Sequence, residues 1–473
     1  MNADRLPETL RAPRLLLAPS QLRLDDGIVA DHAVLVDAGR FADVGPLAAL
    51  RARHPGIETI ELRHTLLMPG FVDGHHHLTQ SFGKALAFGE PSEIFRRIWV
   101  PLEQHLDPRA LYLSAKLAAW EALRGGFTTV CDAGTRAEGG IDAIAAATAE
   151  TGIRCVLALT CNDAGREDDW PALRRAAEQH LARSWRGAAV HASLAISVPE
   201  AASDRALRET AALAADAGAV FQVHVNEHLA SVERSLVARG LRPLEHLDAV
   251  GALGPQALLA HCTLLTPHEI TRLRDSGAAV AYSPVASAWK GNAVAPALLL
   301  HELGVRLALG TDGTRSDGFR LLDAAETAQR LHHGLANGDS SCGAGWTWLD
   351  LASAGGADAA GLGSVTGRIA PGLAADFLLV DLRVPELTPS WDPSWELVRL
   401  AARDQIRAVF VDGRLRLWRG QPLDWDGEAL LDEVDAVARR AVELAPIRRV
   451  HPTADRHRAS VRAGVRPSVR GGR

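Results

Sequence analysis

Short apolar segments recur about every 30 residues through the middle of the chain, and this rhythm restricts the fold more than any other feature. Ala-, Leu- and Arg-rich stretches of helical character separate them, as in βα units. Eight segments are predicted strands: Phe71–His75, Thr128–Asp132, Cys155–Thr160, Val190–Ser197, Val220–Val225, Ala257–His261, Ala279–Ser283 and Val305–Gly310. The predicted helices between them include Arg109–Leu123, Ile141–Ala149, Arg205–Ala217 and Pro267–Asp275.

Eight strands that alternate with helices predict an α/β fold with a (β/α)8 TIM-type barrel, in which functional residues lie at the C-terminal ends of the strands. A doubly wound open sheet is the structural alternative. It is disfavoured because no Gly-x-Gly-x-x-Gly motif follows an early strand.

The two ends of the chain have a different pattern of short strand-like runs broken by turn residues. Such runs occur between residues 14 and 67 and again between residues 367 and 425. We therefore expect one small β-sandwich domain built from residues 1–67 and 367–425, flanking a barrel over residues 68–366. Residues 426–473 are expected to form a C-terminal helix and an Arg-rich tail, which has few apolar residues from Arg448 onward and is predicted to be disordered.

Composition narrows the class of protein. The 473 residues are 47% hydrophobic and 23% charged, which is ordinary for a globular protein, and the net charge of -6 argues against a general nucleic-acid binder. The five cysteines are scattered and indicate a reducing compartment rather than a disulfide framework. No segment has the length of a signal peptide core or a membrane span, so a cytoplasmic protein without membrane partners is expected.

The segment Asp73-Gly74-His75-His76-His77 follows directly after an apolar run. Side chains on a strand repeat every second residue, so His75 and His77 share one face. Two imidazoles at a strand end make half of a metal site, because neutral histidine is the commonest ligand of borderline divalent ions. A polar turn that happens to be rich in histidine is the alternative interpretation.

Three later predicted strands end on residues of similar chemistry: His224 with Glu227, His261, and Asp312. Singly, such a histidine is more often a hydrogen-bonded core residue and such an aspartate a turn residue. In a closed barrel, however, these ends and the His75/His77 end meet at one mouth. Together they predict a metal-dependent site.

The order His-x-His, His-x-x-Glu, His, Asp on the first, fifth, sixth and eighth strands resembles the amidohydrolase superfamily. More narrowly, the chain is similar to the cytosine deaminase and chlorohydrolase-like branch (the ATZ/TRZ group), which includes guanine and 8-oxoguanine deaminases. The resemblance covers nearly the whole chain up to the Arg-rich tail. Its motifs are Pro69-Gly70-Phe71-Val72-Asp73 before the histidines and Gly310-Thr311-Asp312-Gly313 at the eighth strand.

The resemblance implies that one divalent ion is bound by His75, His77, His224 and Asp312. It also implies that Glu227 shuttles protons, that His261 positions the attacking water, and that Asp312 accepts the proton of that water. The expected ion is zinc, with iron as the alternative. A single ion is expected because binuclear members use a carboxylated lysine on the fourth strand, where this chain has none.

Four further residues are predicted to contact the substrate. The run His75–Gln80 is similar to 8-oxoguanine and pterin deaminases of the group, so the Gln80 amide could read the edge of a heterocycle. After the seventh strand, many relatives have a Cys-Pro-x-Ser-Asn loop that this chain lacks. Trp289 could stack on a flat ring there, and Lys290 could meet an acidic substituent. Ser316 is a further pocket candidate, and Trp99 is either a pocket wall or a core residue.

These observations predict a metal-dependent hydrolase that deaminates a nitrogen heterocycle of purine, pterin, pyrimidine or triazine type and releases ammonia. The first alternative is an s-triazine chlorohydrolase or alkylaminohydrolase. The second is a catalytically inactive barrel retained for binding. The expected partner is a small heterocyclic substrate, and association into a homo-oligomer is an expectation from the resemblance alone.

Overall fold

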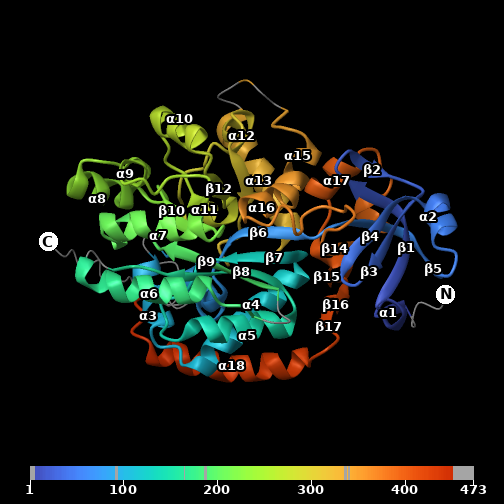
Figure 1. Ribbon diagram of the computed structural model, residues 1–473, viewed down its shortest axis with the longest axis horizontal. Helices are drawn as coiled ribbons and strands as arrows, with labels where there is room; N and C mark the ends of the chain where they lie inside the picture. Colours follow the sequence, from blue (N-terminus) through green and yellow to red (C-terminus); the bar gives the residue numbers. More distant parts are fainter. Residues whose placement is uncertain are drawn as a thin grey trace, which may run out of the picture.

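The computed structural model describes residues 6–90, 94–163, 166–185, 189–334, 338 and 341–450 (Figure 1). The predicted disordered tail lies outside the described residues from position 451 onward. None of the described helices is both long enough and apolar enough to cross a lipid bilayer.

Eight parallel strands form the central sheet, and each pairs with the next one along the chain in the order β6 to β13. They are β6 (Phe71–His76), β7 (Phe127–Asp132), β8 (Arg154–Thr160), β9 (Val190–Ile196), β10 (Phe221–Val225), β11 (Ala257–His261), β12 (Ala279–Tyr282) and β13 (Arg306–Leu309). Each lies within one residue of its predicted range at either end. Asp312 N donates to His75 O at 2.8 Å, which joins the first and last strands at the C-terminal end. The predicted TIM-type barrel is confirmed.

Helices surround these strands. They are α3 (Val100–Glu103), α4 (Pro108–Arg124), α5 (Gly140–Thr151), α6 (Trp170–Leu181), α7 (Asp204–Asp216), α8 (Leu229–Arg239), α9 (Pro243–Ala249), α10 (Pro267–Ser276), α11 (Pro284–Lys290), α12 (Ala297–Glu302), α13 (Gly318–Gln329), α15 (Gly345–Leu351), α16 (Ala354–Ala359), α17 (Pro393–Arg399) and α18 (Gly427–Leu444). The first irregular segment after β6 contains η2 (Leu78–Ala87) and η3 (Phe95–Trp99).

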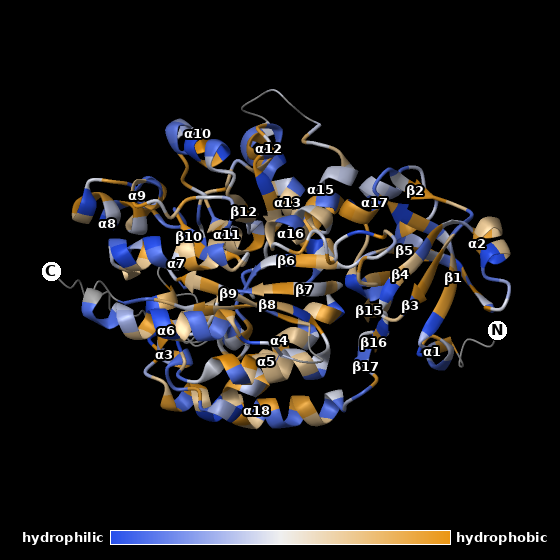
Figure 2. Ribbon diagram, viewed as in Figure 1, coloured by the Kyte–Doolittle hydropathy of each residue, from blue (hydrophilic) through white to orange (hydrophobic). Residues whose placement is uncertain are grey.

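Local chemistry explains where several helices begin. The Asp107 carboxylate accepts from Ala110 N at the start of α4, and Ser203 caps α7 in the same way. Thr266 and Glu269 form a reciprocal capping box at α10. These side chains satisfy backbone N–H groups that have no partner within the helix. Figure 2 shows hydrophobic residues concentrated along the strands, while outer helices such as α18 alternate between hydrophobic and hydrophilic residues.

Strands from both ends of the chain form a second sheet, in the order β17-β16-β15-β14-β5-β1-β3-β4, with β2 on β1. They are β1 (Arg14–Leu24), β2 (Gly27–Val29), β3 (His32–Asp37), β4 (Arg40–Pro46), β5 (Thr59–Pro69), β14 (Phe377–Asp381), β15 (Ile406–Val411), β16 (Arg414–Trp418) and β17 (Gln421–Pro422). Two short helices, α1 (Leu6–Thr9) and α2 (Leu47–Arg53), accompany them. The predicted small β-domain from both termini is present, and its two parts join in one continuous mixed sheet because β14 pairs with β5.

A buried ion pair ties this sheet to the barrel. Arg154, the first residue of β8, donates through Nε to Asp376 Oδ2 at 3.0 Å and through Nη2 to Asp412 Oδ1 at 2.5 Å. The Arg154 and Asp376 side chains are 4% and 0% exposed, whereas that of Asp412 is 42% exposed. Thr366 Oγ1 also donates to Asp376, at 2.7 Å. The attachment therefore lies at the end of β8 opposite the barrel mouth.

Candidate metal centre and active site

The four predicted ligands come from three strands and meet at the C-terminal mouth of the barrel. His75 and His77 lie at the end of β6, His224 is in β10, and Asp312 follows β13. Nε2 of His77 lies 3.2 Å from Nε2 of His224. Asp312 Oδ1 lies 3.4 Å from Nε2 of both His75 and His77. His261, the last residue of β11, has its ring centroid 5.1 Å from that of His75.

The backbone is unusual where these strands end. Asn226, His261, Cys262 and Asp312 have positive φ angles of 51°, 73°, 49° and 57°. Residues with a Cβ rarely adopt this left-handed conformation, which costs about 1 to 3 kcal/mol at each position. The surrounding barrel therefore holds the mouth in a conformation that the local chain does not favour.

A hydrogen bond orients one imidazole of the cluster. His224 Nδ1 donates to the Ser197 carbonyl at 2.6 Å, which leaves Nε2 facing His77. Burial lowers the pKa of both His77 and His224 well below the usual value of 6.5. Both rings are therefore neutral near pH 7, which is the form that binds a metal ion.

Asp73 closes the ring of strands beneath the cluster. Its Oδ1 accepts from Thr311 N at 2.9 Å and from His75 N at 3.2 Å, and its Oδ2 accepts from Thr311 Oγ1 at 2.5 Å. Burial raises the pKa of Asp73 to about 7 despite these bonds. The sequence analysis did not assign a role to this residue, although its spacing of two from His75 placed it on the same strand face.

Lys290, at the end of α11, lies between the two carboxylates of the site. Its Nζ is 2.6 Å from Glu227 Oε1 and 2.6 Å from Asp312 Oδ2. Burial alone would raise the pKa of Asp312, but Lys290, His75 and His261 together outweigh it and keep that pKa well below its usual value. For Glu227, burial is likewise outweighed by His261 and Lys290, and its pKa is also held low. Both carboxylates are thus ionised at neutral pH.

Other side chains fix the position of Glu227. His228 Nε2 lies 3.2 Å from Glu227 Oε1, and His261 Nε2 lies 3.6 Å from Oε2. On its other side, the His228 ring contacts Asn292 Oδ1 at 3.0 Å. His228 and Asn292 were missed in the sequence analysis. Adjacency to Glu227 was the only available signal for His228, and Asn292 had none.

A cavity of about 250 Å³ opens directly over this cluster. Its walls include the four residues His77, His224, Glu227 and Asp312 together with Trp99 and Phe95 from η3. Gln80 and Arg136 also reach it. Both of these contact Glu103, Gln80 through Nε2 at 3.4 Å and Arg136 through Nη1 at 2.9 Å. The site therefore combines an apolar wall with polar groups, as small-molecule sites do.

The four predicted substrate residues are placed differently. Gln80 and Lys290 line the cavity, and Lys290 is held by the two carboxylates. Trp289 is not among the lining residues, and its ring meets that of Phe88 edge-on with centroids 4.3 Å apart. Ser316 is buried, with its Oγ 3.2 Å from Nε2 of His76.

The donor atoms fit a divalent cation. Nε2 of His75 and both ring nitrogens of His261 are buried and have no hydrogen-bond partner among the described residues. The ligand atoms of His75, His77 and His224 lie within 4.8 Å of one another, as do those of His75, His261 and Asp312. Buried polar atoms normally have hydrogen-bond partners, so nitrogens without one are available to bind a cation. Three imidazoles and a carboxylate suit zinc or a similar ion.

Comparisons with known proteins identify the family of the chain. The model of the Amidohydrolase family matches residues 66–416, and that of an imidazolonepropionase-like composite domain of bacteria matches residues 33–56. The chain is 30% identical over 426 residues to 5-methylthioadenosine/S-adenosylhomocysteine deaminase of Pelotomaculum thermopropionicum, covering 88% of this chain and 95% of that protein. It is 31% identical over 365 residues to 5'-deoxyadenosine deaminase of Methanothermobacter thermautotrophicus, covering 75% and 83%.

Solved structures share the whole fold. An adenosine deaminase from Xanthomonas campestris with bound zinc superposes with a TM-score of 0.82 at 26% identity, covering 91% of this chain and 99% of that one. An atrazine chlorohydrolase from Arthrobacter aurescens TC1 complexed with zinc gives a TM-score of 0.79 at 22% identity, covering 90% and 100%. Because the family model spans most of the 473 residues and the predicted site is assembled within that span, the chain belongs to the amidohydrolase family.

Proposed function

We propose that this protein is a metal-dependent hydrolase that removes the exocyclic amino group of an aminopurine nucleoside and releases ammonia. The observation that carries the proposal is the convergence of His75, His77, His224 and Asp312 with Glu227 and His261 at one rim. A barrel kept only for binding would not require a buried carboxylate and a buried unpaired imidazole beside a ligand cluster.

We assign the metal ligands to His75, His77, His224 and Asp312, with one zinc ion as the expected cofactor. When bound, the ion acts as a Lewis acid that lowers the pKa of a water molecule toward about 7. The absence of lysine from β9 supports a single ion.

The remaining chemistry falls to side chains of the chain. Glu227 is ionised, takes up one proton from the water that attacks the ring carbon and passes it to the neighbouring ring nitrogen. Asp312 is also ionised, accepts the second proton of that water and passes it to the amino group, which leaves as ammonia. His261 donates a hydrogen bond to the attacking oxygen and steadies the charge that develops there. The 3.6 Å separation of His261 Nε2 and Glu227 Oε2 supports action of these two groups on the same carbon. Lys290, which contacts both carboxylates, keeps them oriented toward each other.

The substrate assignment rests on the relatives and the cavity. The curated relatives that this chain matches over most of their length are named as deaminases of adenosine derivatives. The Trp99 and Phe95 side chains supply an apolar wall for a flat ring, and the Gln80 amide supplies both a donor and an acceptor for its edge. The likeness to the atrazine chlorohydrolase, at 22% identity, supports the fold but not that substrate.

A substrate panel tests the proposal. Zinc-loaded protein is incubated with adenosine, 5'-methylthioadenosine, S-adenosylhomocysteine, 8-oxoguanine, and chlorinated and alkylamino s-triazines, while ammonia, chloride and alkylamine are measured. We expect ammonia from the aminopurine nucleosides, with kcat/KM at least about 100-fold above that for any triazine. The Glu227→Gln variant is the control and should lose that ammonia release. Chloride or alkylamine release would instead support the triazine alternative, and no release from any compound would support the inactive barrel.

Zinc rather than iron, a cytoplasmic location and association into a homo-oligomer stay predictions. Metal analysis of purified protein and light scattering would address the first and third of these.

A further inference from the structure

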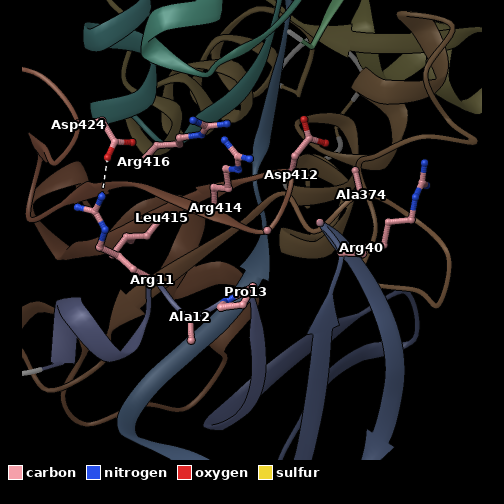
Figure 3. A pocket seen from close by; sticks show the side chains of 13 residues that line it. Arg11, Ala12, Pro13, Arg40, Ala374, Asp412, Arg414, Leu415, Arg416 and Asp424 are labelled. Atoms are coloured by element: carbon pink, nitrogen blue, oxygen red, sulfur yellow. Dashed lines mark hydrogen bonds and ion pairs between the residues drawn. The ribbon is translucent and has the colours of Figure 1, made fainter. Parts of the chain in front are cut away.

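A second and larger cavity, of about 740 Å³, lies on the terminal sheet (Figure 3). It is bounded by the segment before β1, by the turn between β3 and β4, and by the turn between β15 and β16 followed by β16 itself. Four arginines and two aspartates line it: Arg11, Arg40, Arg414, Arg416, Asp412 and Asp424. This volume is within the range of small-molecule sites. We call it the arginine groove.

The charges in the groove do not balance. Asp424 is bound by Arg11 at 2.8 Å, and Asp412 is bound by Arg154 of the barrel at 2.5 Å. Arg40 donates to the Gly372 carbonyl at 2.7 Å. Both carboxylates of the groove are therefore already paired.

Arg414 and Arg416 form no ion pair with an acidic residue among the described residues. They lie two residues apart on β16 and both reach the groove, while Leu415 and Leu417 between and beyond them are buried. Neither guanidinium has a hydrogen bond or ion pair within the described part of the chain. Figure 3 shows their two guanidinium groups next to each other, and the charge of Arg414 acts directly on Arg416.

Arg416 differs from a solvated surface arginine. Its Nε atom is buried and has no hydrogen-bond partner among the described residues. Gly152, at the C-terminal end of α5, packs on its guanidinium, and a Cβ at that glycine would lie 2.3 Å from Arg416 Cζ. Burial, followed by the charge of Arg414, lowers the pKa of Arg416 from its usual value, and the charges of Asp412, Asp424 and Asp376 offset these effects only in part. A half-buried cation held beside a second cation is costly, and a bound anion would remove that cost.

From this geometry we infer that the arginine groove binds a small molecule that carries phosphate groups. The planar guanidinium fork matches phosphate oxygens in pairs, and two forks on one strand face can engage two phosphates or one phosphate from both sides. The groove lies beside Arg154, at the opposite end of β8 from the metal centre. The inference is independent of the proposed function.

Calorimetric titration of the full, zinc-loaded protein tests the inference. The probe is fructose 1,6-bisphosphate, which has two phosphate groups and no nitrogen ring for the barrel cavity. We expect saturable binding of one equivalent that weakens as salt is added. The Arg414→Gln/Arg416→Gln variant should bind at least tenfold more weakly. Fructose should not bind, and citrate should bind at least tenfold more weakly than the bisphosphate.

Matched variants separate binding from folding. Arg63→Gln/Arg383→Gln removes two exposed positive charges from the same domain outside the groove, and its affinity should stay within twofold of the unmodified protein. Because Arg416 packs on Gly152, its substitution could disturb folding; the single Arg414→Gln variant, at an exposed position, should still weaken binding at least threefold. The inference is overturned if the unmodified protein shows no saturable binding at millimolar probe, or if the groove variants bind as it does. Equal affinity for citrate would overturn the assignment to phosphate.

Discussion

The two ends of the barrel strands both contain buried charged and polar groups, but they use them differently. At the sheet-facing end, each hydrogen-bonding oxygen of Asp376 is taken by Arg154, Thr366 or the backbone N–H of Asp412. At the mouth, Nε2 of His75 and the ring nitrogens of His261 are buried and have no hydrogen-bond partner in the part of the chain that the structure describes. The first arrangement is complete within the chain, whereas the second is completed only by a ligand.

This contrast separates groups that stabilise the fold from groups that serve chemistry. A buried pair that is fully hydrogen-bonded becomes costly only when one partner is removed. Buried donors and acceptors that lack partners are costly in the protein as it stands, and they persist where a ligand offsets them. Substitutions at the two ends should therefore affect different measurements.

The largest effect is expected at the mouth. Replacing Asp312 by Asn removes a metal ligand and the base for the attacking water, so kcat/KM should fall by at least about 10⁴-fold, or about 5 kcal/mol in activation free energy. The midpoint of thermal unfolding without metal should fall less than in Asp376→Asn, because Lys290 keeps Glu227 as a counter-charge. Steady-state kinetics and calorimetry on the same preparation measure both. Retained activity would remove Asp312 from the catalytic assignment.

The next effect is expected at the opposite end. Asp376→Asn leaves the buried Arg154 without its main counter-charge and should lower the free energy of unfolding by about 3 to 5 kcal/mol. Asp412→Asn is the matched control, with an expected loss of no more than about 1 kcal/mol because that carboxylate is 42% exposed. Urea unfolding measures both. Equal losses would show that the network is not organised around Asp376.

Metal binding provides a third comparison. Zinc at about 100 times its dissociation constant should raise the free energy of unfolding by about 2.7 kcal/mol, since only the folded protein assembles the site. The increment should vanish in His75→Ala/His77→Ala and persist in Asp376→Asn. Thermal unfolding with and without zinc follows it. An unchanged increment in the double variant would contradict the proposed ligands.

The smallest effect on the free energy of unfolding is expected for Asp43, a surface carboxylate far from both ends of the barrel strands. The hydrogen bond from Arg53 lowers the pKa of Asp43 to about 2, against about 4 in an unfolded chain. The resulting stabilisation is present above about pH 4 and is lost as the pH falls toward 2. Asp43→Asn should therefore cost less than about 1 kcal/mol at pH 7 and progressively less below pH 4. Urea unfolding at pH 7, 5 and 3 tests this, and a pH-independent difference would rule out the ionic origin.

The barrel fold and the cluster of metal-ligand candidates at its mouth could be predicted from the sequence for physical reasons. Parallel strands buried on both faces are continuous apolar runs, so Ala257–His261 and its equivalents stand out. The barrel fixes where such strands end, and that fixes which chemical groups meet. His75 and His261 could thus be placed together although 186 residues separate them.

Contacts made by loops and long side chains could not be predicted from the sequence pattern. Lys290 reaches Glu227 and Asp312 only because α11 ends over the mouth, and no periodicity encodes that. Trp289, one residue earlier, meets Phe88 instead of the cavity. The pairing of Arg154 with Asp376 joins positions 222 residues apart through side chains alone. Sequence pattern predicts the faces of elements, whereas these contacts depend on how separate elements are packed.

The shared sheet has a consequence for how the chain is made. Strand β5 ends at Pro69, but its neighbour β14 begins only at Phe377, about 300 residues later. A ribosome that adds 5 to 20 residues per second would need about 15 to 60 s to deliver that neighbour. During this interval the edge of β5 is open to other strands. The barrel segments therefore leave the ribosome before the N-terminal strands have their C-terminal neighbours. Strands β14 to β17, which complete the sheet, are made near the end of translation.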